Sequence, residues 1–232
     1  MFESILIQSL QLLLSFDKNV YQIISLSLYV SFTAIFFSCL ISFPLACLLA
    51  IKKFCLKDFI IIIINSLMSL PPVVVGLILY LFFSYQGLFG NLNVLYTPIA
   101  MIIAQIIIII PIIISLSKDA LEKSYNIFSD YFISIKATDI LISKTILWET
   151  RYSLLIIIIT GLGRALSEVG AILIVGGNID NLTRVMTTSI VLETSRGNLA
   201  MAMSFGIALI LISIIINIFL YLFRKIKISR YD

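Results

Sequence analysis

Apolar residues in this chain fall in long, nearly unbroken blocks. Five blocks are long enough to cross a bilayer as helices, which takes about 20 mostly apolar residues. In lipid the backbone must satisfy its own hydrogen bonds, so the blocks are predicted to be helical even where runs of isoleucine favour strands in water. The pattern therefore predicts an all-α polytopic membrane protein. Its expected spans are 20–51, 59–82, 96–116, 152–175 and 199–223.

The first sixteen residues follow a different pattern. Ser4, Gln8, Gln11 and Ser15 recur at steps of three and four residues, which places them on one stripe of a helix. At 1.5 Å per residue this segment is about 24 Å long, which is short of a span. We expect residues 1–16 to form an interfacial amphipathic helix on the extracytoplasmic side.

Prolines interrupt two of the predicted spans. Pro71 and Pro72 lie in the middle of the second span, and Pro111 lies in the last third of the third. Proline removes one hydrogen bond from the helix and kinks it, which is tolerated when neighbours cover the freed carbonyl. Both a packing kink and a broken helix beside a transport pathway fit this pattern.

Composition agrees with a membrane protein and excludes several chemistries. The chain is 61% hydrophobic and 12% charged, about half the charge of a soluble domain. It has no histidine, which excludes Ser-His triads and imidazole metal sites. Cys39, Cys47 and Cys55 fit neither a zinc site nor a disulfide framework. No Walker A pattern is present, so we expect this chain not to bind and hydrolyse ATP itself. We also expect no catalytic residue, metal or bound cofactor in this chain, and no nucleic-acid partner.

The basic residues predict the orientation. Twelve of the sixteen Lys and Arg residues lie between spans one and two, between spans three and four, and in the tail 224–232. Short cytoplasmic loops carry this excess of positive charge. The amino terminus is therefore expected outside the cytoplasmic membrane, and the basic tail inside the cell.

The loop 117–151 is too polar to cross the membrane and too long for a simple turn. Its apolar residues recur at three- and four-residue steps, which predicts a pair of amphipathic helices. Such helices suit a helix-in-groove contact with another subunit. The alternative is that the loop only caps its own bundle.

The fourth predicted span carries an intramembrane ion pair. Arg164 lies near its centre and Glu168 follows one turn later. Lone charges there cost about 2.5–3.5 kcal/mol each on insertion scales. Gly163, Ser167 and Ala171 form a stripe of small residues on nearly the same side, which permits close helix packing. The pair either holds the bundle together, or attracts a passing dianion through Arg164 while Glu168 limits how tightly it is held.

Polar residues and glycines follow that span. The amides of Gly176, Gly177 and Asn178 are candidates for an anion-binding nest. Thr183 and Arg184 are further hydrogen-bond donors for oxyanion oxygens. The alternative is an ordinary polar external loop.

The loop 117–151 resembles the coupling segment of ATP-binding-cassette importer permeases. Asp130 stands where that segment has Glu, Lys136-Ala137-Thr138 stand at its turn, and Ile146 matches its Ile. The chain departs from the pattern at Tyr131-Phe132, which replace two alanines, at Lys136, which replaces glycine, and at Trp148-Glu149, which replace Leu-Pro. The missing glycine suggests either a turn in an αR-like form or a lysine that contacts the partner.

Other segments resemble the molybdate/tungstate branch of the same family. They are SLMSLPPVVVGLILYLFFS (66–84), LYTPIAMIIAQ (95–105) and GLGRALSEVGAILIVGGNI (161–179), and LTRVMTTSIVLETSRG (182–197) is similar to the tungstate-type permeases in particular. The resemblance implies the type I importer fold over 20–223, with five transmembrane helices. It also implies a homodimer, two separate ATPase subunits that use ATP and Mg²⁺, and an extracytoplasmic oxyanion-binding protein.

The implied cargo is a tetrahedral oxyanion, tungstate first and molybdate or a sulfate-like anion second. An amino-acid permease and an assembly factor are less favoured alternatives. A membrane-embedded enzyme is also less favoured, since one intramembrane ion pair without histidine offers little for catalysis. The residues expected to couple to the ATPase are Asp130, Ile135, Lys136, Ala137, Thr138 and Ile146. Those expected to line a path or gate are Arg164, Ser167, Glu168, Gly176, Gly177, Asn178, Thr183 and Arg184.

Overall fold

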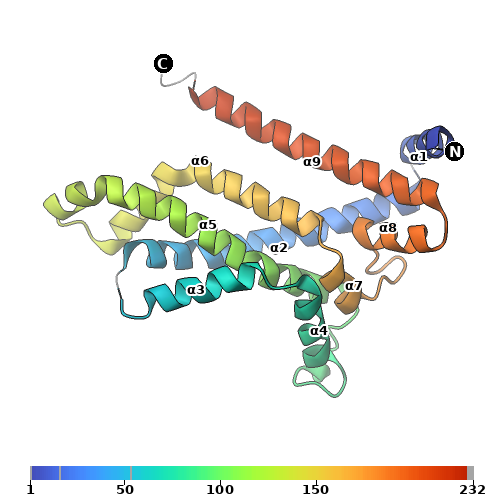
Figure 1. Ribbon diagram of the computed structural model, residues 1–232, viewed down its shortest axis with the longest axis horizontal. Helices are drawn as coiled ribbons and strands as arrows, with labels where there is room; N and C mark the ends of the chain where they lie inside the picture. The colour runs from blue at the N-terminus through green and yellow to red at the C-terminus, as the bar shows by residue number, and fades with distance from the viewer. Residues whose placement is uncertain (1, 16, 53, 229–232) are drawn as a thin grey trace. The chain divides into compact units, whose positions relative to one another are not determined.

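The computed structural model describes residues 2–15, 17–52 and 54–228, and this part of the chain is helical without strands (Figure 1). The predicted all-α class is confirmed. The elements are α1 (Phe2–Leu14), α2 (Lys18–Ile51), α3 (Lys57–Met68), α4 (Pro72–Phe83), the 3₁₀ turn η1 (Gly90–Leu92), α5 (Pro98–Ser134), α6 (Asp139–Leu166), α7 (Gly170–Gly176), α8 (Met186–Ser195) and α9 (Leu199–Ile228).

By length and composition, α2, α5, α6 and α9 can each cross a membrane. The predicted second span is instead divided into α3 and α4, which are bent sharply and supply a fifth span only if they count as one. The consecutive prolines explain the break. Neither Pro71 nor Pro72 has an amide hydrogen for the carbonyl four residues before it, and Pro72 occupies the first turn of α4, where no such bond is needed. The helix is therefore broken at this proline pair, and the transport pathway beside it stays a prediction.

The single proline in α5 has no such effect. The helix passes through Pro111 and continues to Ser134, well beyond the end of the predicted span at residue 116. The next helix, α6, begins at Asp139. The predicted pair of helices within 117–151 is present as the ends of α5 and α6 joined by a turn, but each is continuous with the apolar helix beside it. No glycine or proline lies between 112 and 160, so nothing in the local sequence stops either helix where it becomes polar.

The chain forms two compact units, and α2, α5 and α6 each contribute to both. Unit 2 comprises residues 35–70 and 106–161. Its core is made of small and aliphatic side chains from three helices together with Phe132, namely Ala46, Cys47 and Ala50 of α2, Leu121 and Phe132 of α5, and Ile142 and Ile146 of α6. Small residues on α2 let the larger side chains of α5 and α6 approach its backbone.

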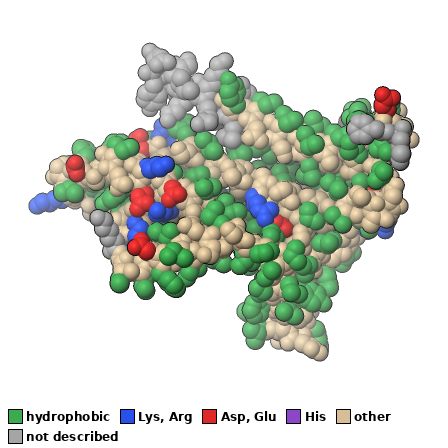
Figure 2. All heavy atoms as spheres, in the orientation of Figure 1, with side chains coloured by type: hydrophobic (Ala, Val, Ile, Leu, Met, Phe, Trp, Pro, Cys, Tyr) green, Lys and Arg blue, Asp and Glu red, His purple; other side chains and the backbone are tan. Residues whose placement is uncertain are grey.

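Ion pairs join the polar ends of the unit 2 helices. Glu122 lies 3.1 Å from Lys57 Nζ and 2.6 Å from Lys118 Nζ, and Lys52 pairs with Asp139. Partial burial opposes the charge of Glu122, but the hydrogen bonds and charges of the two lysines outweigh it and lower the pKa of this carboxyl below its ordinary value. On the face shown in Figure 2, charged side chains gather toward the end where α5 and α6 meet.

Unit 1 comprises residues 1–34, 71–105 and 162–232. Its core brings α2 together with α8 and α9 through Val20, Ile23, Met186, Phe205 and Ala208. The amino-terminal helix α1 packs against α9, and Leu13 contacts this core. The polar stripe of α1 is exposed, as are Ile7, Leu10 and Leu14. The predicted helix thus forms, while Phe16 at its end lies outside the described residues.

The packing of α4 against α7 depends on Gly76 in α4. A Cβ at this position would lie 2.8 Å from the Cα of Ala171, and a backbone atom cannot move aside cheaply. We expect Gly76→Ala to lower the free energy of unfolding by about 1–3 kcal/mol, measured by thermal unfolding in detergent. Gly206→Ala in α9 is the matched control, because a Cβ there meets nothing within 4 Å. Equal stability of the two variants would contradict the packing argument.

Candidate functional site

The predicted fourth span is interrupted at the ion pair. A continuous helix over 152–175 is wrong, because α6 ends at Leu166 and α7 begins at Gly170. The three connecting residues include Glu168, whose Oε1 accepts a hydrogen bond from the amide of Ala171 at 3.2 Å. The carboxylate therefore caps the first turn of α7, where the amides lack helical partners and negative charge is favoured.

The predicted pair of Arg164 and Glu168 is present, with 3.1 Å between Nη1 and Oε2. The two side chains differ in burial: the guanidinium side chain is 37% exposed and the carboxylate side chain only 4%. Burial without a partner would cost the carboxylate several kcal/mol. Arg164 therefore supports a buried charge, while part of its own surface stays open.

Two polar side chains hold the break between α6 and α7 from other helices. Gln105 of α5 donates from Nε2 to the carbonyl of Ala165 at 3.0 Å. Thr187 of α8 donates to the carbonyl of Glu168 at 2.8 Å. The bond from Thr187 satisfies the carbonyl of Glu168 in the connection, and the bond from Gln105 adds to the one that the carbonyl of Ala165 accepts from the amide of Glu168 at 3.2 Å. The break is therefore specified by tertiary hydrogen bonds.

A small polar cavity of about 10 Å³ lies beside the break, with room for about one water molecule. Gln105, Glu168 and Ser31 are among its lining residues. The Oε1 of Gln105 is buried without a hydrogen-bond partner in the described part of the chain. Sequence reasoning missed Gln105. Its signal was a single amide in an otherwise apolar stretch of the third predicted span.

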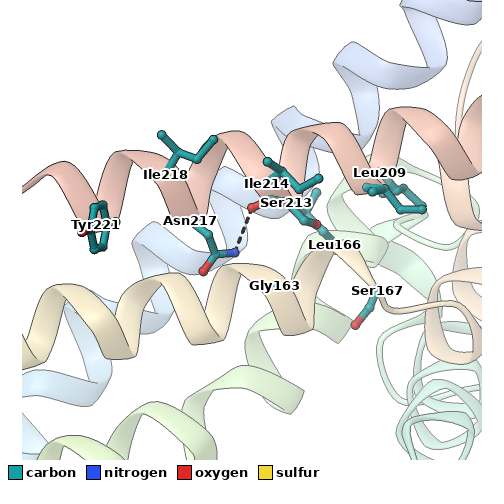
Figure 3. A pocket seen from close by; sticks show the side chains of 10 residues that line it. Gly163, Leu166, Ser167, Leu209, Ser213, Ile214, Asn217, Ile218 and Tyr221 are labelled. Atoms are coloured by element: carbon teal, nitrogen blue, oxygen red, sulfur yellow. Dashed lines mark hydrogen bonds between the residues drawn. The ribbon is translucent and has the colours of Figure 1, made fainter.

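A groove of about 550 Å³ separates the end of α6 from α9 (Figure 3). Gly163 and Ser167 line it from the α6 side, and Ser213 and Asn217 line it from α9. A Cβ on Gly163 would meet nothing within 4 Å, so this part of the predicted small-residue stripe contacts no other helix among the described residues. Ala171, the third member of the stripe, lies on α7 and is buried.

The segment after α7 is a closed turn. The amide of Gly177 donates to the carbonyl of Leu173 at 3.0 Å, and its φ of 68° ends the helix in the left-handed region that glycine favours. This amide is therefore used for capping, and the predicted anion nest does not form with it. A side chain here would also collide with Tyr96, whose ring lies 2.7 Å from the Cβ position.

The remaining residues predicted for a gate lie in the same turn and bond to one another. Thr183 donates from Oγ1 to the carbonyl of Gly176 and accepts from the amide of Ile179. Arg184 pairs with Asp180 at 2.8 Å. Asn178 is left-handed with φ of 51°. Beyond this turn the chain forms the half-buried helix α8 (Met186–Ser195).

The α5–α6 turn (residues 135–138) has the bonds of a Schellman motif. The amide of Ala137 donates to the carbonyl of Phe132, and the amide of Lys136 donates to that of Ile133. Lys136 has φ of 48°, so the αR-like form suggested by the missing glycine is wrong. The position favours glycine, and a side chain with a Cβ adopts this conformation at a cost of about 1–2 kcal/mol.

The helix ends on both sides of the α5–α6 turn present apolar side chains outward. Ile133 is 72% exposed and Ile140 is 81% exposed. The predicted coupling residues Asp130, Ile135, Lys136 and Thr138 are also exposed, while Ala137 is half-buried. Ile146 is fully buried in the unit 2 core. It can position the turn but cannot itself contact a partner.

Four long apolar helices, together with a half-buried ion pair at a helix break, indicate a polytopic membrane protein. The chain belongs to the family of ABC transporter permeases that includes the tungstate uptake permeases. The predicted resemblance is confirmed, and the chain is a permease and not an enzyme.

The chain is 39% identical over 213 residues to the tungstate uptake system permease protein TupB of Peptoclostridium acidaminophilum, covering 92% of this chain and 93% of the relative. It is 33% identical over 202 residues to a probable anion ABC transporter permease protein of Haloferax volcanii, covering 84% and 87%. TupB of Campylobacter jejuni is 37% identical over 161 residues, covering 68% and 66%. No protein-family model matches the chain.

Proposed function

We propose that this chain is the permease subunit of an ATP-driven importer that carries tungstate across the cytoplasmic membrane. The observation that carries the proposal is the similarity over nearly the whole chain to a tungstate uptake permease. A second relative of this kind supports the same cargo. The proposed importer also contains two ATPase subunits, which use ATP and Mg²⁺, and an extracytoplasmic binding protein that selects the oxyanion.

The α5–α6 turn is the proposed docking site for each ATPase subunit. Exposed Ile133 and Ile140 offer apolar anchors on both sides of the turn, and such anchors suit a groove on a partner. Lys136 adds a positive charge at the tip. The Schellman hydrogen bonds make the turn rigid. A movement of the ATPase would therefore be transmitted to α5 and α6, whereas a flexible loop would absorb it.

A homodimer accounts for the polar groups on the surface of unit 1. Arg164 and Ser167 are partly or fully exposed, at a depth where exposure of charge to lipid is costly. A second copy over this face would remove these groups from lipid and leave an aqueous path between the copies. Arg164 would attract a dianion in that path, and Glu168 would keep the anion from binding too tightly.

The 176–184 turn is the proposed outer gate, with the amino terminus outside the cell and the carboxyl terminus in the cytoplasm. The positive-inside distribution of Lys and Arg supports this orientation. Since the gate residues bond mainly to one another, their role in this proposal is to close the path as a unit.

Purification of the chain from its own cells in mild detergent tests the proposal. We expect an ATPase subunit to copurify, and the complex in vesicles to take up tungstate only with ATP and the binding protein. Titration of that binding protein with tungstate and molybdate decides the cargo. A protein that binds an amino acid would overturn the cargo and leave the importer intact, whereas failure of any ATPase to copurify would overturn the importer itself.

A further inference from the structure

An exposed stripe on α6 combines cations with an aromatic ring just before the apolar part of the helix begins. Lys144, Trp148, Arg151 and Leu155 recur at steps of four, three and four residues, which places them on one helix face. Trp148 is 65% exposed and Leu155 is 39% exposed. The apolar run that follows starts at Tyr152. The stripe therefore crosses the level at which α6 would leave the headgroup region for hydrocarbon.

The guanidinium of Arg151 is held by two aromatic rings. Its Cζ lies 4.4 Å from the centroid of the Trp148 ring and 4.7 Å from that of Tyr152, within cation–π distance of both. Its Nη1 also donates to the carbonyl of Trp148. An arginine held in this way loses less conformational entropy on binding, and its planar edge matches the geometry of a phosphate.

Negative charge on α6 lies away from this stripe. Glu149 is two residues before Arg151, about 200° around the helix, and it lines a groove toward α5 together with Asp119. Asp139, at the start of α6, pairs with Lys52. The stripe itself therefore carries two cations without a carboxylate, and the apolar surface of Leu155 follows on the same face.

We propose that this stripe binds an anionic phospholipid, with the phosphate at Arg151 and an acyl chain along Tyr152 and Leu155. The inference rests only on the chain spanning a membrane and not on its cargo. Charge complementarity favours an anionic lipid over a neutral one. Each Lys or Arg near a membrane surface strengthens the binding of anionic lipid by about fivefold. Arg151 lies about 18 Å along the axis from the start of α6. A lipid bound at Arg151 would therefore fix how far the α5–α6 turn lies from the membrane surface.

The chain contains a single tryptophan, so its fluorescence reports on this stripe directly. The full chain is placed in vesicles of phosphatidylcholine with a fixed share of phosphatidylglycerol. In one arm the phosphatidylglycerol carries brominated acyl chains, and in the other an equal amount of phosphatidylcholine does. We expect brominated phosphatidylglycerol to quench Trp148 more strongly than brominated phosphatidylcholine does. The difference should correspond to a phosphatidylglycerol share beside Trp148 about fivefold above its share in the vesicle.

Variants connect the preference to Arg151. Arg151→Gln should remove most of the enrichment, since only Lys144 then remains as a cation on the stripe, and Arg151→Lys, which keeps the charge but lacks the planar edge, should reduce it less. Lys123→Gln removes an exposed cation of α5 and should leave it unchanged. Equal quenching by the two lipids in the unaltered chain would overturn the proposal. Absence of quenching by either lipid would also overturn it, because a protein surface, such as a second copy, would then cover the stripe.

Discussion

Replacing Lys136 with Glu and Ala137 with Asp together should abolish tungstate uptake while the chain stays in the membrane. Both residues lie in the α5–α6 turn, where Lys136 is exposed and Ala137 is half-buried beside the unit 2 core. The double change reverses the positive charge at the tip and places a second carboxylate beside its apolar anchors, where burial against a partner is costly. The measurement is ATP-dependent uptake in vesicles, normalised to the amount of permease in the membrane.

Lys136→Gly is the matched control for this prediction. Glycine adopts the left-handed conformation of residue 136 without strain, so the turn should keep its Schellman bonds and become more stable by up to about 1 kcal/mol. Uptake should persist if the shape of the turn matters more than the lysine charge. Survival of uptake in the Lys136→Glu, Ala137→Asp double variant would contradict docking at this turn.

Removing Arg164 should destabilise the protein more than removing Glu168. In Arg164→Met the carboxylate, 4% exposed, would lose its cation, and breaking a buried pair in this way costs about 3–5 kcal/mol. In Glu168→Gln the guanidinium keeps access to the surface, and the new amide oxygen can still accept from the amide of Ala171. We therefore expect about 1–2 kcal/mol for Glu168→Gln, measured by thermal unfolding in one detergent.

The double variant Arg164→Met, Glu168→Gln separates structure from transport. With both charges removed, no unpaired charge is buried, so most of the lost stability should return. If uptake returns as well, the pair is structural. If stability returns and uptake does not, Arg164 acts on the passing anion. Equal destabilisation by the two single changes would contradict the asymmetric burial on which this prediction depends.

The sequence by itself determined the helical class, the apolar segments and the family. Long apolar blocks leave the backbone no alternative to helices in lipid, so local composition is sufficient. The Arg164–Glu168 pair was also predictable, because two intramembrane charges one helical turn apart favour each other strongly over any other partner. The helical character of 117–151 was predictable from its periodicity, although the continuity of these helices with the apolar segments on both sides was not. Polarity predicted an end to the third span at residue 116, whereas the helix continues because 112–134 lacks the glycine and proline that commonly end one.

Only the tertiary structure decided where helices stop and which polar residues face inward. The end of α6 depends on Gln105 and Thr187, whose bonds to Ala165 and Glu168 join residues 60 and 19 positions apart in the chain. Packing among helices also buries Ile146. It likewise leaves the side chain of Arg164 more exposed than that of Glu168. Composition along one segment carries no information about such partners, because the free energy of a broken helix depends on what satisfies its unpaired carbonyls.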